Sequence, residues 1–142
     1  MRGSAALVAL LAAWPASAAS LAVEVEGVTP GRGPVQVALC VGGLDEAACR
    51  SGQAATAAAP ALRVVFSDVP RGTYAVAAYQ DLDDSGRLER TTLGLPTKPY
   101  GFSNGAGRRG RPDFAAAAFA LDEPGAVVRV RLVPGVQGRP GR

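Results

Sequence analysis

The sequence contains no histidine and a single lysine, Lys98, among its 142 residues. Without histidine, the chain cannot build a Ser-His-Asp or Cys-His nucleophile system, a histidine general base, or a histidine-ligated zinc or copper site. An enzyme built from this chain would depend on carboxylates, arginine, tyrosine or a hard cation. We therefore expect a non-catalytic protein with no cofactor, except for Ca²⁺ at the acidic loop described below.

The chain also lacks a strong excess of charge of either sign. Its 15 basic residues stand against 12 acidic residues, which gives a formal net charge of +3. Nucleic-acid binding normally needs a concentrated basic face, so this balance does not favour it. We instead expect a monomer that binds an envelope component, a peptide or a glycan.

The first 18 residues have the pattern of an export signal. Arg2 supplies the positive start, residues 5–13 the short apolar core, and Ala16-Ser17-Ala18 the small-residue cleavage pattern. The apolar run is shorter than the roughly 20 residues that a bilayer span needs, and no later segment is apolar enough for one. This pattern predicts a periplasmic or secreted protein that is cleaved near Ala18 and Ala19.

The only two cysteines, Cys40 and Cys49, predict one disulfide. An even pair in an exported protein is most simply bonded, here closing a short loop. Two free buried thiols are the alternative. The spacing excludes a redox CxxC motif.

Apolar residues that alternate with polar ones predict short strands around residues 21–25, 35–41, 62–66, 73–80 and 126–132. Such strands, separated by turn residues, are typical of an all-β fold. We predict a single antiparallel β-sandwich of about seven strands with an immunoglobulin-like arrangement.

The sandwich is expected over residues 19–134, followed by a disordered tail at 135–142. Two segments inside it are ambiguous. Residues 42–60 permit either a short helix or a mobile loop. Residues 114–121 fit a helix or a strand, and we favour the strand because the segment is short and lies among other strands.

Oxygen-bearing groups follow the spacing of a calcium-binding loop, at relative positions one, three, five, seven and nine: Asp81, Asp83, Ser85, the Arg87 carbonyl and Glu89. Gly86 permits the sharp turn that such a loop needs. However, Thr92 stands at position twelve, where a bidentate glutamate is usual, and Arg87 and Arg90 add repelling charge. The alternative is an acidic surface turn in which aspartates cap backbone amides.

Tyr100, Phe102 and Asn104 lie in a glycine-containing segment that would suit a binding loop. Aromatic residues beside glycines make adaptable contacts with a ligand. The alternative, which we favour, is that these aromatics pack over the edge of a sheet.

The stretch GTYAVAAYQDLDDSGRLE, followed by LGLPTKPYGFSN and RPDF, resembles the exported bacterial domain of unknown function 2141 family. The likeness covers roughly residues 64–121, and YGFSN is its most distinctive motif. It implies a secreted or periplasmic sandwich similar to prealbumin-like or carboxypeptidase-regulatory-like domains, with no established catalytic activity. The family pattern has histidine at Gln80, asparagine at Ser85 and glutamate at Lys98. If the family binds a metal through those groups, this chain should bind it more weakly or not at all.

These observations predict an exported, non-catalytic binding or cell-envelope-associated module whose ligand is unknown. One alternative is a structural domain stabilised by Ca²⁺ through the loop at 81–89. A second alternative is a hydrolase of envelope glycans or peptides that uses paired carboxylates.

Overall fold

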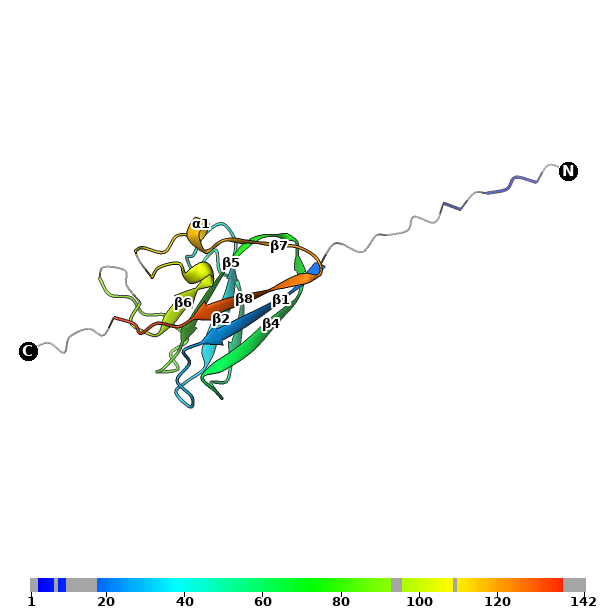
Figure 1. Ribbon diagram of the computed structural model, residues 1–142. Coiled ribbons are helices and arrows are strands. Elements are labelled where there is room, and N and C mark those ends of the chain that lie inside the picture. The colour runs from blue at the N-terminus through cyan, green and yellow to red at the C-terminus, as the bar shows by residue number, and fades with distance from the viewer. Residues whose placement is uncertain (1–2, 7, 10–17, 93–95, 109, 137–142) are drawn as a thin grey trace, which may run out of the picture.

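The computed structural model describes residues 3–6, 8–9, 18–92, 96–108 and 110–136. Within them, eight strands form two facing layers (Figure 1). The strands are β1 (Ala18–Glu26), β2 (Val35–Cys40), β3 (Ser51–Ala55), β4 (Ala61–Pro70), β5 (Gly72–Gln80), β6 (Tyr100–Phe102), β7 (Phe119–Leu121) and β8 (Gly125–Arg131). The helical elements are a 3₁₀ turn, η1 (Ser103–Gly105), and α1 (Phe114–Ala117). The predicted all-β sandwich is confirmed.

The first sheet has the order β4-β1-β8, and the second has the order β3-β2-β5-β6, with β7 paired to the start of β5. The strand pairs of the described residues are antiparallel, as predicted for the sandwich, except that β1 and β8 run parallel. The chain enters β8 beside the start of β1, where the Ser20 amide donates to the Pro124 carbonyl at 3.1 Å. Alternation of apolar residues says which face of a strand is buried but carries no information on strand direction.

Alternate side chains from both sheets meet in one interior. Val23, Val25, Val37, Val76 and Val130 are all fully or almost fully buried in this cluster. Burying a side chain of this size stabilises the fold by about 1.5–3 kcal/mol relative to leaving it exposed. The period of two in the sequence therefore corresponds to the observed core.

Both ambiguous segments differ from what the sequence predicted for them. Within 42–60, neither a short helix nor a mobile loop describes residues 51–55, which form the edge strand β3 because their backbone pairs with β2. Within 114–121, a strand was expected throughout, but α1 occupies 114–117 and only β7 is a strand. The helix forms because the Asp113 carboxylate accepts a hydrogen bond from the Ala116 amide at 2.7 Å and alanines follow it.

The chain crosses from the first sheet to the second directly after β8. Val133 exchanges backbone hydrogen bonds with Tyr100, at 2.8 and 3.0 Å, so it continues beside β6. A Cβ atom at Gly101 would overlap the Arg131 carbonyl oxygen, so only glycine permits this close approach. The glycine of the YGFSN motif therefore serves the join between the two sheets.

Most of the predicted export signal and of the predicted tail lies outside the described residues. Residues 3–6 and 8–9 are exposed and have no regular secondary structure. At the other end, the Val136 amide donates to the Pro96 carbonyl at 2.9 Å, so chain contacts extend at least to this residue. In the described part of the chain, no helix has the length and apolarity that a membrane span requires.

The end of β5 is attached to a neighbouring turn by the fully buried Gln80. Its amide oxygen accepts from the Thr29 amide at 2.9 Å, and its amide nitrogen donates to the carbonyls of Thr29, Arg32 and Gly33 at 2.8 to 3.2 Å. Four backbone groups of the turn therefore depend on one side chain. A buried polar group without a partner carries a large desolvation penalty, so this side chain matters for stability.

We expect Gln80→Leu to lower the free energy of unfolding by about 1–3 kcal/mol, because it leaves these backbone groups unpaired in the interior. Urea unfolding monitored by circular dichroism measures the difference. Gln53→Leu is the matched control, since the exposed side chain of this glutamine donates to one backbone group, the Val65 carbonyl, at 2.9 Å. Equal effects of the two substitutions would contradict the role assigned to Gln80.

Candidate binding groove and acidic loop

A hollow on the outer face of the second sheet follows from the register of its strands. Residues directly opposite each other on paired strands point to the same face. Here Gly52, Ala38, Ala77 and Phe102 form one row across β3, β2, β5 and β6. Three of these four residues carry a methyl group or no side chain, so the row is a trough, which is the name we use for it below.

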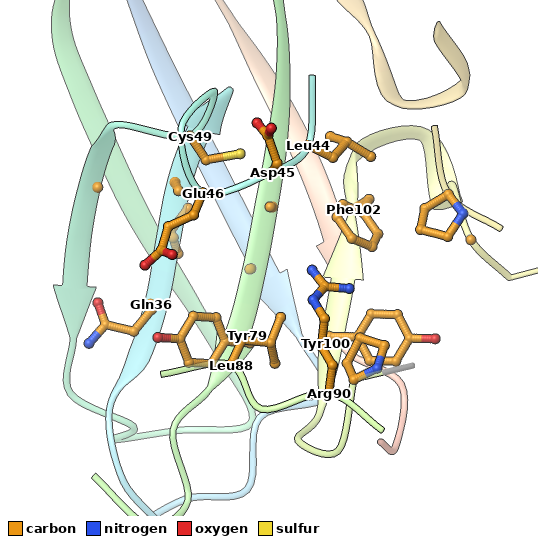
Figure 2. A pocket seen from close by; sticks show the side chains of 18 of the residues that line it. Gln36, Leu44, Asp45, Glu46, Cys49, Tyr79, Leu88, Arg90, Tyr100 and Phe102 are labelled. Carbon is orange, nitrogen blue, oxygen red and sulfur yellow. The ribbon is translucent and has the colours of Figure 1, made fainter. Parts of the chain in front are cut away.

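The trough is the floor of a groove with a volume of about 1260 Å³. The next row across the sheet forms one wall and consists of Gln36, Tyr79 and Tyr100. Figure 2 shows this row on one side of the groove and the loop with Cys49, Glu46, Asp45 and Leu44 on the opposite side. Arg87, Leu88 and Arg90 also line the groove, and Arg111 and Pro112 line it from the segment before α1.

The predicted disulfide between Cys40 and Cys49 is confirmed and supports the second wall. It joins the end of β2 to the far end of the loop that carries Asp45 and Glu46. Inside this loop, the Asp45 carboxylate accepts from the Ala48 amide at 2.9 Å. The wall is therefore attached covalently to the sheet that it borders.

The side chain of Lys98 lies inside the acidic loop formed by residues 81–89. From the sequence, this lysine was noted only as a departure from the family pattern. Its ammonium nitrogen lies 2.6 Å from an oxygen of Asp81 and 2.6 Å from an oxygen of Asp83. It also donates to the Ser85 hydroxyl at 2.8 Å and to the Arg87 carbonyl. Lys98 is only 5 % exposed. Two features of the sequence point to Lys98. It is the one lysine of the chain, and it lies between Pro96 and Pro99 shortly after the acidic loop.

Four of the five predicted loop groups therefore converge, but they converge on an ammonium. The fifth residue, Glu89, is exposed and is not among the groups that contact Lys98, while its backbone carbonyl accepts from the Thr97 amide at 2.9 Å. The loop also shows the amide capping expected of an acidic turn. The Asp81 carboxylate accepts from the Gly86 amide at 2.7 Å, and that of Asp83 from the Ser85 amide at 3.2 Å.

The YGFSN segment is partly structural. Tyr100 lines the groove, whereas Phe102 is buried in a second apolar cluster with Ala75 and closes one end of the trough. The Asn104 amide donates to the Ala118 carbonyl at 2.9 Å and so holds the end of α1. Sequence reasoning missed Ser103, whose buried hydroxyl donates to the Ala117 carbonyl at 2.6 Å and accepts from the Val76 amide at 2.9 Å.

The model of an uncharacterized protein family conserved in bacteria, DUF2141, matches residues 23–129. The chain belongs to the DUF2141 family. No curated protein and no solved structure matches it. The matched range runs from β1 into β8, so the groove and the acidic loop both lie in the DUF2141 region. The further likeness to prealbumin-like domains stays a prediction.

The charges in the acidic loop shift the pKa values of its members. The hydrogen bond from Lys98 holds the pKa of the Asp83 carboxyl well below its ordinary value of 3.8. Burial by itself would lower the pKa of Lys98, but the hydrogen bonds and charges of Asp81 and Asp83 raise it above 10.5. Tyr79, whose ring centroid is 6.0 Å from the ammonium, has a pKa raised by burial and by the Asp81 charge. The loop of this DUF2141 domain is thus an ion-pair network at neutral pH.

We expect Asp83→Asn to lower the melting temperature at neutral pH, by an amount that shrinks in acid. A depressed pKa contributes stability above about pH 4, and this contribution is lost as the pH falls towards the depressed value. Lys98 has the opposite sign, since its contribution is present below pH 10.5 and is lost as the pH rises through the raised pKa. Thermal unfolding of both proteins from about pH 7 to about pH 2 measures the difference.

Asp84→Asn is the control for this series, because Asp84 is an exposed acid of the same loop outside the set of groups that contact Lys98. It should leave the melting temperature nearly unchanged at every pH. A difference for Asp83→Asn that stays constant down to the lowest pH would contradict the ion pair.

Proposed function

We propose that this chain is an exported, non-catalytic binding module that holds a neutral oligosaccharide of the cell envelope in the groove. The observation that carries the proposal is the trough of small residues between an aromatic wall and a polar wall. The trough crosses four strands, a length of about 14 Å at the usual strand spacing. This length suits a short, extended ligand.

The aromatic wall supports a sugar ligand through stacking. Tyr79 and Tyr100 are directly opposite each other on β5 and β6, so both rings lie on the outer face. Both side chains are half-buried, which leaves part of each ring accessible from the groove. Tyrosine presents an apolar ring together with a polar hydroxyl, which suits the mixed C–H and O–H surface of a pyranose.

The polar groups on the two sides of the groove are complementary to hydroxyl groups. Asp45 and Glu46 offer acceptors, while Arg87 and Arg111 offer donors. A sugar hydroxyl both donates and accepts, so it can satisfy either side. With Arg90, the described lining carries three basic side chains against two acidic ones, so its net charge is small and favours a neutral ligand over a polyanion.

The position of the trough favours a glycan over a peptide. An extended peptide gains most when it adds as a strand to a free sheet edge. Here the floor is the face of β2 and β5, whose backbone groups are already paired in the sheet. A ligand in the trough must therefore be recognised by side chains.

Export and the absence of catalysis are also part of this proposal. The disulfide favours an oxidising compartment, and the first 18 residues have the pattern of an export signal.

Among the described residues that line the groove, the carboxylates are Asp45 and Glu46, adjacent in the chain and on one wall. A glycosidase needs two carboxyl groups that flank the scissile bond from opposite sides.

We expect the purified protein to bind one or more neutral tetrasaccharides in a panel of glucose- and N-acetylglucosamine-based chains, measured by isothermal titration calorimetry. Tyr79→Ala and Tyr100→Ala should each weaken binding about tenfold or more, because truncating a central aromatic typically costs more than 1 kcal/mol. Ala38→Leu should also weaken it, since it fills the trough while leaving both tyrosines in place.

Val127→Ser is the control, because Val127 is exposed on β8 in the other sheet. It should bind as the wild type does. Binding that survives Ala38→Leu and both tyrosine substitutions would place the ligand elsewhere. A panel without binding, or tight binding of an extended peptide in the trough, would overturn the assignment to oligosaccharides.

We expect the full chain expressed in a bacterium to be recovered from the periplasm or the medium, with a mass that corresponds to an N-terminus near Ala19. Mass spectrometry of the purified product measures this. Ala18→Arg should block cleavage, because the signal peptidase requires small residues there. An uncleaved wild-type product in the cytoplasm would contradict export.

A further inference from the structure

The cation bound by the acidic loop is part of the same chain, because it is the ammonium group of Lys98. Asp81, Asp83, Ser85 and the Arg87 carbonyl stand at loop positions one, three, five and seven, and all four groups contact the Lys98 ammonium. These are positions from which a calcium-binding loop supplies its oxygen ligands. The shared spacing raises the question of whether a free metal ion fits here as well.

The residues present do not fit a free metal ion. Calcium requires six to eight oxygens at 2.3–2.6 Å, and the ammonium already lies 2.6 to 2.8 Å from the side-chain oxygens that would have to surround the ion. An ion in that place would have to displace Lys98 or stand against its positive charge. In the described residues, no three His, Cys, Asp or Glu side chains form a group that could hold a metal.

The segment that carries Lys98 is fixed in register with the loop. The Thr97 amide and hydroxyl both donate to the Glu89 carbonyl, at 2.9 and 3.0 Å. On the other side, the Pro99 carbonyl accepts from the Gln80 amide at 2.9 Å. The backbone on both sides of Lys98 is therefore bound to both ends of the loop, which directs the ammonium into it.

We propose that Lys98 is the resident cation of this loop and replaces a metal ion there, so that removing its ammonium converts the loop into a calcium site. One positive charge then stands where a divalent ion would otherwise be needed to hold the carboxylates of Asp81 and Asp83 together. The loop is ordered without any ion from solution. This inference is independent of the ligand proposed for the groove.

The first measurement uses the unmodified protein. Its melting temperature should be the same in EDTA and in millimolar CaCl₂, because a ligand that does not bind the native state cannot stabilise it. A rise of several degrees in calcium would overturn the proposal. This arm needs no substitution, so it decides even if every Lys98 variant fails to fold.

The second measurement uses Lys98→Met, which keeps the apolar stem and removes the charge. Its melting temperature in EDTA should fall by about 10 °C or more, because Asp81 is then a buried charge without its partner. Millimolar CaCl₂ should restore much of this loss. A variant as stable as the wild type in EDTA, or a destabilised variant that calcium does not restore, would overturn the replacement of a metal by Lys98.

Two further variants test the geometry. Lys98→Glu adds a carboxylate in place of the ammonium and should bind one calcium ion per chain in isothermal titration calorimetry. Asp83→Asn combined with Lys98→Glu removes one negative charge from the ligand set and should weaken this binding at least tenfold, whereas Asp84→Asn combined with Lys98→Glu should leave it unchanged. Equal binding by the two double variants would place the calcium outside the loop and overturn the proposal.

Discussion

A buried ammonium joins three parts of this fold that are separate in the sequence. Lys98 is removed from water, so its charge must be balanced by nearby oxygens, and two carboxylates, a hydroxyl and a carbonyl supply them. Meeting this requirement joins the end of β5, the acidic loop and the segment before β6. Arg87, whose carbonyl takes part, also lines the groove, so part of the groove is held by the same network.

The groove itself exists because the outer face of the second sheet is covered only in part. Near the end of β2, the disulfide loop and α1 cover Cys40 and Ala75 in a second apolar cluster. Further along, Ala38 and Ala77 have nothing large beside them in their row except Phe102. Small residues that would be unremarkable singly become a trough when the register aligns them.

Several parts of this arrangement could be predicted from local patterns. Alternation identified the buried faces of β1, β2, β5 and β8, and the presence of two cysteines in a chain with an export signal indicated the disulfide. The calcium-loop hypothesis grouped the oxygens of Asp81, Asp83 and Ser85, and in the structure these oxygens surround the Lys98 ammonium. The cation at their centre was not identified, because Lys98 lies 17 residues after Asp81 and no local period relates the two. The parallel pairing of β8 was missed because alternation does not record direction.

The sequence by itself determined the all-β class, the membership in a bacterial family and the exclusion of histidine chemistry, since these depend on composition and on short-range patterns. Only the tertiary structure decided which residues lie opposite one another across strands. Cross-strand neighbours such as Ala38 and Ala77 are far apart in the chain, and their alignment depends on register, which the packing of the whole sandwich sets. The trough and the lysine-filled loop are both products of such long-range contacts.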